Sequence, residues 1–375
     1  MIFSRIRPIY PIRRIGLCAK KPSHAEFLMS EYSYSADDQS LLTPVLYKYF
    51  VDPLVKVLPY RLPANLITLI AFSFVVIAFG IAAYGYRVGR YDFWWTIPIL
   101  AFLYIIGDCS DGKQARKTGT GSPLGEYFDH FLDCFVTGLL MGILMISFRV
   151  TKPAIITIGF FNLYAGQIGS FWERYKRRVM CFGKLSTSEG IILIGLTSWL
   201  MSIPLLQTLA HTILIFNIAV ADILIIVSMI GVAFSAIQAL IRANTVSFRL
   251  IAHFILSLVI TYTAASLFGN NNMVYITGIV SFYNVFFLAS LLAATNLDSR
   301  ETLPDIIIPL SFVLFFLLPN YTSLIQTVQI AYLAVRVGIK FVVFIRINRQ
   351  YWYWINPPPP TEDLSATRQS DRDSR

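Results

Sequence analysis

The sequence has little charge and few cysteines. Only 14% of its 375 residues are Asp, Glu, Lys or Arg, whereas 56% are hydrophobic and 15% are aromatic. This composition excludes an ordinary soluble domain and predicts a polytopic membrane protein. The four cysteines have no disulfide, redox or metal spacing, so we interpret them as free thiols: Cys18, Cys109, Cys134 and Cys181.

The first 40 residues lack an uninterrupted apolar run. They contain six Lys and Arg residues before the first acidic residue, Glu26, so a cleaved signal peptide is not expected. We interpret this segment as a basic cytoplasmic arm, with an organelle transit peptide as the alternative. Residues 41–62 mix apolar, charged and proline residues, which predicts an amphipathic segment at the membrane interface. Residues 347–375 are rich in Pro, Ser, Asp and Arg, which predicts a disordered tail.

Long apolar segments fill the rest of the chain, and no internal repeat is evident. The predicted fold class is an all-α integral membrane protein with about ten transmembrane helices. We expect the spans at about residues 65–86, 93–111, 123–148, 154–172, 190–206, 213–241, 250–268, 273–295, 306–318 and 323–345. With both termini cytoplasmic, 27 of the 31 Lys and Arg residues lie on or near the inner side, as the positive-inside rule requires. The net charge of +10 therefore indicates loops that face anionic headgroups rather than nucleic acid binding.

Four carboxylates stand between the second and third expected spans, where charge is costly. Asp108 and Asp111 are three residues apart, and Asp129 and Asp133 are four apart, so each pair lies on one face of a helix. Two such faces that meet across a helical hairpin would form an all-oxygen site, which suits hard cations such as Mg²⁺ or Mn²⁺. The pattern predicts a two-metal site for phosphoryl transfer.

The residues between the two pairs of aspartates suit a phosphate group. Gly112 is expected to let the chain turn after Asp111. The loop that we expect there carries three cations for phosphate oxygens: Lys113, Arg116 and Lys117. Ser122 and Pro123 are typical of a helix N-cap and first helical residue, which places Glu126 in the first turn of the next helix.

The spacing D-x2-D-G-x2-A-R-x8-G-x3-D-x3-D resembles, position for position, the signature of the CDP-alcohol phosphotransferase family. The residues that fill it are Asp108, Asp111, Gly112, Ala115, Arg116, Gly125, Asp129 and Asp133. The wider context resembles the choline/ethanolamine phosphotransferase branch, where the position of His130 holds the catalytic base. Phe131 and Leu132 replace two small residues of that branch, which bears on the packing beside the lipid acceptor.

The resemblance implies the site residues. The four aspartates would hold two Mg²⁺ or Mn²⁺ ions, and the catalytic residues would be His130, which acts as the base, and Asp133. The substrate-binding residues would be Asn65, Gly112, Lys113, Ala115, Arg116, Gly125, Glu126, Glu173 and Glu189. For Asn65 the alternative is a helix cap, and for Glu173 and Glu189 it is a role in the salt bridges of a basic loop.

The function implied is transfer of phosphocholine or phosphoethanolamine from CDP-choline or CDP-ethanolamine to diacylglycerol, with release of CMP. One alternative is a phosphatidyltransferase that uses CDP-diacylglycerol and an acceptor such as inositol, serine or glycerol phosphate. The remote alternative is an ion-coupled transporter.

The resemblance also implies a division of the chain. Residues 63–242 would form a six-span catalytic core, and residues 243–346 four further spans for dimerisation, as a homodimer, or for lipid access. The active site would face the cytoplasm, in the endoplasmic reticulum or Golgi of a eukaryote or the inner membrane of a bacterium.

Asp222 is expected in mid-span and is therefore a functional candidate by default. We favour the alternative that it is a structural hydrogen-bond partner.

Overall fold

The computed structural model describes residues 36–38, 40–182, 187–215, 217–297 and 299–349, all of which belong to one unit of the chain, Ser35–Arg375. Most of the predicted N-terminal arm and tail lies outside these residues. The elements are β1 (Ala36–Asp38), α2 (Thr43–Leu46), η1 (Tyr47–Val51), α3 (Asp52–Val57), α4 (Ala64–Val88), α5 (Thr96–Thr118), α6 (Pro123–Ser147), α7 (Pro153–Arg177), β2 (Met180–Phe182), α8 (Thr187–Leu200), α9 (Pro204–Ala210), β3 (Ile213–Ile215), β4 (Ile218–Ala219), α10 (Val220–Ala243), α11 (Phe248–Phe268), η2 (Gly269–Asn272), α12 (Met273–Leu297), α13 (Ile307–Ser311), α14 (Leu314–Leu317), η3 (Pro319–Tyr321) and α15 (Thr322–Ile347).

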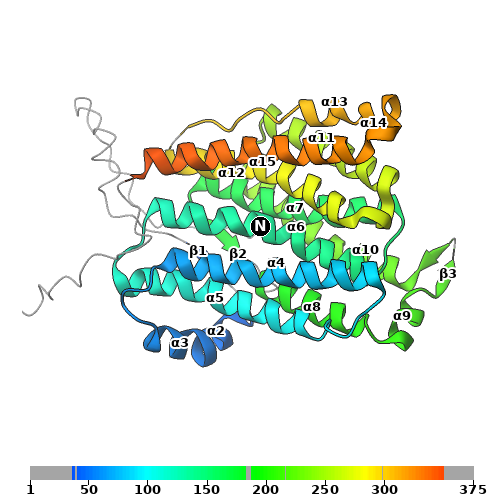
Figure 1. Ribbon diagram of the computed structural model, residues 1–375. Coiled ribbons are helices and arrows are strands. Elements are labelled where there is room, and N and C mark those ends of the chain that lie inside the picture. Colours follow the sequence, from blue (N-terminus) through cyan, green and yellow to red (C-terminus); the bar gives the residue numbers. More distant parts are fainter. Residues whose placement is uncertain (1–35, 39, 183–186, 216, 298, 350–375) are drawn as a thin grey trace, which may run out of the picture. The chain divides into compact units, whose positions relative to one another are not determined.

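The long helices lie side by side (Figure 1). In the described part of the chain, seven are long and apolar enough to cross a membrane, and eight if a bent pair forms one span. A helix of 25 residues is about 37 Å long, which exceeds the roughly 30 Å of a bilayer core. The chain is therefore an all-α, multi-pass integral membrane protein. The count of ten spans is not confirmed. α5 is as long as its neighbours but carries the charged motif in its last turns.

Three of the expected spans look different in the structure. Residues 190–206 form α8 and α9, which are bent by 109° at a break before Pro204, a residue that has no backbone N–H for a continuous helix. β3 and β4 pair as antiparallel strands before α10, so this helix starts later than expected. Residues 307–317 form the short helices α13 and α14, which together reach only about 16 Å.

Asp222 is the third residue of α10 and is not in mid-span, because β3 and β4 precede this helix. Its buried carboxylate accepts a hydrogen bond from the backbone N–H of Ala219 at 2.9 Å and pairs with the Lys152 ammonium. The structure therefore confirms the interpretation of Asp222 as a structural hydrogen-bond partner.

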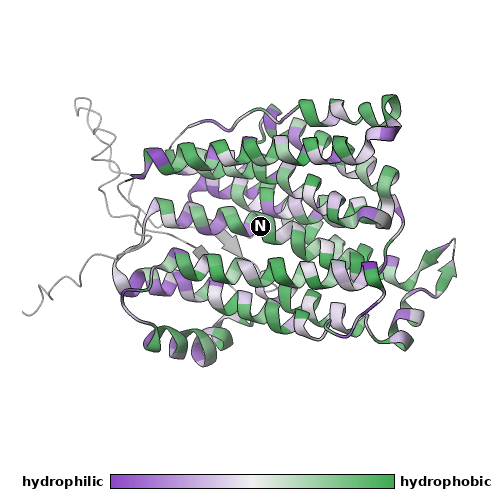
Figure 2. Ribbon diagram, viewed as in Figure 1, coloured by the Kyte–Doolittle hydropathy of each residue, from purple (hydrophilic) through white to green (hydrophobic). Residues whose placement is uncertain are grey.

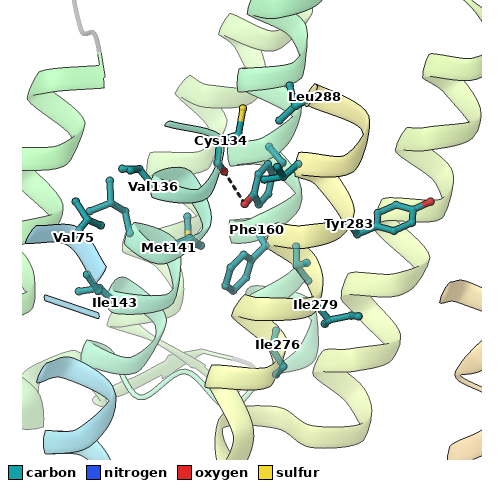
Figure 3. Close-up of a cluster of buried hydrophobic side chains, with 14 of the residues drawn as sticks. Val75, Cys134, Val136, Met141, Ile143, Phe160, Ile276, Ile279, Tyr283 and Leu288 are labelled. Atoms are coloured by element: carbon teal, nitrogen blue, oxygen red, sulfur yellow. Dashed lines mark hydrogen bonds between the residues drawn. The ribbon is translucent and has the colours of Figure 1, made fainter. Parts of the chain in front are cut away.

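α6 and α12 form the centre of the bundle. The buried share of the apolar stretch is 83% in α12 and 67% in α6, but only 22% in α15 and 28% in α10. Figure 3 shows the core where α4, α6, α7 and α12 meet, with Val75, Val136, Met141, Ile143, Phe160, Ile276, Ile279 and Tyr283 among its side chains. The weakly buried faces of α10 and α15 are the ones that would contact lipid.

The predicted interfacial segment is largely helical from α2 to α3, and it packs against α5. Thr43–Val57 carries exposed Tyr49 and Phe50 beside exposed Lys56, the mixture expected of a helix at a membrane surface. Figure 2 shows hydrophilic residues gathered at the end of the bundle where α5 ends and α6 begins. The carboxylate motif lies at this end.

Candidate active site

The carboxylate motif lies on a helical hairpin made of α5 and α6, as predicted. α5 ends at Thr118, and Gly119 follows in the left-handed conformation with φ 67°. α6 starts at Pro123, where the Ser122 hydroxyl accepts a hydrogen bond from the Gly125 N–H at 3.1 Å. The predicted N-cap is confirmed.

Tyr104 connects the two arms of the hairpin. Its hydroxyl donates a hydrogen bond to Asp133 Oδ1 at 2.7 Å and lies 3.5 Å from Asp108 Oδ1. One phenol thus brings a carboxylate from α5 and a carboxylate from α6 to the same point. Sequence reasoning missed Tyr104, although its position four residues before Asp108 places it on the same helix face.

Asp129, His130 and Asp133 form a group on α6 that could hold a metal ion. One ligand atom from each lies within 4.8 Å of the others. His130 Nδ1 is 3.8 Å from Asp129 Oδ2 and 3.6 Å from Asp133 Oδ2. Asp129 Oδ1 is buried and has no hydrogen-bond partner among the described residues. A buried carboxylate oxygen without a partner, in a set of oxygen and imidazole donors, fits a divalent cation.

The Asp111 carboxylate is positioned by a hydrogen bond from a residue of α4. The Thr68 hydroxyl donates a hydrogen bond to Asp111 Oδ2 at 2.6 Å, and both residues are buried. Asn65, one turn earlier on α4, is also buried, and its Oδ1 would lie 3.5 Å from a Cβ added at Gly125. The structure thus brings Asn65 and Gly125 to the base of the same hairpin.

The phosphate loop predicted after Asp111 is instead the last two turns of α5. Gly112 is helical, so the chain does not turn there, because the capping at Gly119 lets the helix continue to Thr118. The Ala115 carbonyl takes part in this end, since it accepts a hydrogen bond from the Thr120 N–H at 2.9 Å. The predicted cations therefore project from a helix.

The three cations of this helix end have different surroundings. Lys113 pairs with Asp52 of α3. Lys117 donates to the carbonyl oxygens of Val55 at 2.7 Å and Leu58 at 2.8 Å, at the C-terminal end of α3. Arg116 is exposed and has no carboxylate partner in the part of the chain that the structure describes. Of the three, Arg116 is therefore the one placed to receive an anionic ligand.

Tyr47, which sequence reasoning also missed, joins the interfacial helix to the site. Its hydroxyl donates to the Cys109 carbonyl at 3.4 Å, and burial raises the pKa of Tyr47 to about 12, although Arg116 nearby lowers it. The phenol therefore stays protonated at neutral pH and serves as a hydrogen-bond donor.

The three predicted glutamates have ionic or polar partners of their own. Glu126 forms a buried ion pair with Arg174 of α7, which brings α7 to the hairpin. Glu173 is 1% exposed in its side chain and accepts from Arg242 through both oxygens, each at 2.7 Å. The Glu189 carboxylate accepts from the Ser40 hydroxyl at 2.7 Å and the Leu42 N–H at 2.8 Å. These contacts show Glu173 and Glu189 linking elements of the scaffold.

Phe131 points away from the carboxylates. Its ring stacks on Phe341 of α15 at 4.9 Å between centroids and on Tyr127 at 5.9 Å. Tyr127 in turn stacks on Phe344 of α15 at 3.8 Å. The bulky residue that departs from the family pattern therefore packs α6 against α15.

Comparison with known proteins finds a family match that includes these residues. Residues 61–221 match the family model described as CDP-alcohol phosphatidyltransferase. An uncharacterised CDP-alcohol phosphatidyltransferase class-I family protein of Schizosaccharomyces pombe is 35% identical over 175 residues, 44% of this chain and 45% of the relative. Choline/ethanolaminephosphotransferase 1 of Saccharomyces cerevisiae is 30% identical over 218 residues, 57% and 55% of the two chains. Cholinephosphotransferase 1 of Bos taurus is 31% identical over 198 residues, 48% of each chain.

The chain thus spans about half the length of the curated relatives it matches. The matched stretch holds the α5–α6 hairpin, all four aspartates and His130. Residues 61–221, which contain the site described above, therefore match the CDP-alcohol phosphatidyltransferase family model.

Proposed function

We propose that the protein transfers phosphocholine or phosphoethanolamine from a CDP-alcohol to the hydroxyl of diacylglycerol and releases CMP. The observation that carries this proposal is the Asp129, His130 and Asp133 group on α6, joined to Asp108 of α5 through the Tyr104 hydroxyl. The relatives named choline/ethanolaminephosphotransferase and cholinephosphotransferase support the choice of donor.

Asp108, Asp111, Asp129 and Asp133 would hold two Mg²⁺ or Mn²⁺ ions. Bound divalent ions would supply charge neutralisation for the pyrophosphate and for the CMP leaving group. The buried, unpartnered Asp129 Oδ1 is the atom that most directly supports this assignment. The Thr68 hydroxyl orients the Asp111 carboxylate, since it occupies one of the four lone-pair positions.

His130 would accept the proton of the diacylglycerol hydroxyl. The hydroxyl oxygen then forms a bond to the phosphorus that carries the alcohol headgroup, and the bond from that phosphorus to the CMP oxygen breaks, so CMP leaves with the electron pair. Asp129 and Asp133 flank His130 Nδ1 and stabilise the ring once it is protonated.

The remaining predicted contacts would position the donor. Arg116, exposed at the end of α5, would bind phosphate oxygens, with Gly112 and Ala115 lining the same helix end. Asn65, Gly125 and Glu126 would contact the nucleotide. Four of the predicted contacts already have protein partners in the structure, so any contact with substrate would require a change in those partners: Lys113, Glu126, Glu173 and Glu189.

We further propose that the site opens to the cytoplasm, where CDP-alcohols are found, and that diacylglycerol enters from the bilayer. The membrane would be the endoplasmic reticulum or Golgi in a eukaryote and the inner membrane in a bacterium. The protein would work as a homodimer, with α11 to α15 as the region for dimerisation or lipid access.

The experiment offers radiolabelled CDP-choline and CDP-ethanolamine separately to purified protein in detergent with diacylglycerol and Mg²⁺ or Mn²⁺. We expect label in lipid and release of CMP, neither of which should occur with Asp111→Ala. CDP-diacylglycerol with inositol or serine serves as the contrast. Product from that contrast alone would overturn the donor, the acceptor and the role of His130, and absence of CMP in every arm would favour a transporter.

A further inference from the structure

An open pocket lies outside the carboxylate site. It has a volume of about 380 Å³ and is formed by the last turn of α7, the start of α11 and the segment after α12. We call it the α7–α11 pocket. Its lining residues are Tyr175, Lys176, Ser247, Phe248, Arg249, Arg300, Glu301 and Leu303. None of them belongs to the motif, and the pocket contains neither His130 nor any of the four aspartates.

Positive charge dominates the α7–α11 pocket. Lys176, Arg249 and Arg300 line it together with one carboxylate, Glu301. No ion pair involves these three cations in the part of the chain that the structure describes. Three cations facing one carboxylate give a local excess of positive charge, which favours an anionic ligand.

Two of the cations are held in place by neutral contacts. The Lys176 ammonium lies over the rings of Trp172 at 4.6 Å and Tyr175 at 4.5 Å. Arg249 donates a hydrogen bond to the backbone carbonyl of Glu301. These contacts position the side chains without neutralising them, so their charge remains for a ligand.

The start of α11 adds to the positive potential. This helix has 21 residues, and the Ser247 hydroxyl caps it by accepting from the Leu250 N–H at 3.1 Å. The N-terminal end of a helix carries a partial positive charge and favours phosphate groups. Ser247 and Arg249 therefore both attract a phosphate to the same wall of the pocket.

The rim of the pocket is apolar. Phe248 is 77% exposed and Leu303 is 61% exposed, on two different walls. A soluble anion has no apolar part that could contact Phe248 and Leu303. A phospholipid has acyl chains close to its phosphate, and these could contact both side chains. Exposed aromatic and aliphatic side chains next to cations are typical of protein surfaces at the level of the headgroups.

We propose that the α7–α11 pocket binds the phosphate of a membrane phospholipid, with preference for an anionic lipid such as phosphatidic acid. The site is separate from the transfer reaction. It shares α7 with the hairpin, because Arg174 pairs with Glu126 while Tyr175 and Lys176 line the pocket. A bound lipid would therefore stabilise the last turn of α7.

The test is native mass spectrometry of the full chain released from detergent in the presence of phosphatidic acid or phosphatidylcholine. We expect wild type to retain phosphatidic acid, and Arg249→Gln/Arg300→Gln to bind it about tenfold more weakly. The matched control, Lys56→Gln/Arg346→Gln, removes two exposed cations from outside the pocket and should bind as wild type. Equal retention by all three proteins would overturn the proposal.

A second variant separates loss of lipid binding from misfolding. It is needed because Arg249 contacts the Glu301 backbone, so its replacement could disturb the fold. Arg300→Gln alone changes an exposed side chain, and it should weaken phosphatidic acid binding while Tm without added lipid stays that of wild type. Phosphatidic acid should raise Tm of wild type more than that of this variant. Equal Tm shifts in both proteins would contradict a site at Arg300.

Competition identifies the source of the phosphate. Inorganic phosphate or CMP, added at the same concentration as phosphatidic acid, should leave the lipid bound. Displacement by either soluble anion would overturn a lipid site in favour of a site for free phosphate. Because no readout here depends on turnover, the result is independent of the proposed transferase activity.

Discussion

Asp111 shows how a single carboxylate at the site depends on a neighbouring helix. Its Oδ2 accepts the Thr68 hydroxyl hydrogen bond from α4. Asp111→Ala should abolish turnover, while Thr68→Val should leave the carboxylate but lose its orientation, so the Mn²⁺ concentration for half-maximal activity should rise about 10–100-fold. Titration of activity with Mn²⁺ measures this. A wild-type metal requirement in Thr68→Val would show that the hydrogen bond is structural only.

His130 and Phe131 are adjacent in sequence and have different neighbours, because His130 lies beside Asp129 and Asp133 whereas Phe131 stacks on Phe341. His130→Ala should retain metal and nucleotide binding and lose turnover by about 10²–10⁴, the usual contribution of a general base. Phe131→Leu, which alters the contact with Phe341, should change turnover far less. Single-turnover assays with nucleotide binding in parallel separate the two effects. Wild-type turnover in the His130 variant would remove this residue from the mechanism.

Arg116 and Lys117 offer a matched pair of cations. Arg116→Ala should raise KM for the CDP-alcohol by about 10–100-fold, because a charge-assisted hydrogen bond contributes roughly 1.5–3 kcal/mol. Lys117→Ala removes the same charge but breaks the contacts with Val55 and Leu58, so it should lower Tm and leave KM nearly unchanged. Steady-state kinetics and thermal unfolding distinguish them. Equal KM values for both variants would argue for a general effect of charge.

At this scale the sequence located the aspartates and the Ser122 cap, because both follow from spacing along one helix. It did not locate the partners that come from other helices. Thr68 is 43 residues from Asp111, and Arg174 pairs with Glu126 across two helices. Such contacts depend on how helices pack, and no local pattern in the sequence specifies this packing.

The helices pack closely where glycine allows it. A Cβ at Gly138 of α6 would lie 1.9 Å from Ser281 Oγ and 3.0 Å from Ser281 Cβ of α12, whereas a Cβ at Gly231 of α10 meets nothing within 4 Å. Gly138→Ala should destabilise the protein by about 1–3 kcal/mol through overpacking. Gly231→Ala should be neutral or stabilising, because alanine favours a helix. Thermal unfolding in detergent tests the pair, and equal Tm values would show that α6 and α12 can separate without cost.

Hydropathy predicted the long uniform helices well and the interrupted segments poorly. α4, α6, α7, α11 and α12 lie within a few residues of their predicted bounds. The segments around Pro204 and Pro309 have the same apolar composition but do not form one straight helix. Composition reports whether a segment prefers lipid, while proline and packing decide whether it can cross.

For the whole molecule, removal of metal should have a thermodynamic effect beyond loss of activity. Four carboxylates brought together repel one another unless a cation neutralises them. EDTA should lower Tm of wild type on the order of 5 °C, and Mn²⁺ should restore it, since binding to the folded state alone stabilises it. Asp129→Asn/Asp133→Asn serves as the control and should show no response to either. An unchanged Tm in wild type would contradict a metal site at the hairpin.

α6 carries Asp129, His130 and Asp133 and also packs against α12 and α15, and both of those helices come after residue 221, where the family match ends. The family match therefore covers only part of the set of helices that pack against one another. A chain cut after α10 would keep every motif residue and yet expose to lipid the face of α6 on which Gly138 receives Ser281. Any redesign of the carboxylate site must therefore include the helices after residue 221, because they support the helix that carries Asp129 and Asp133.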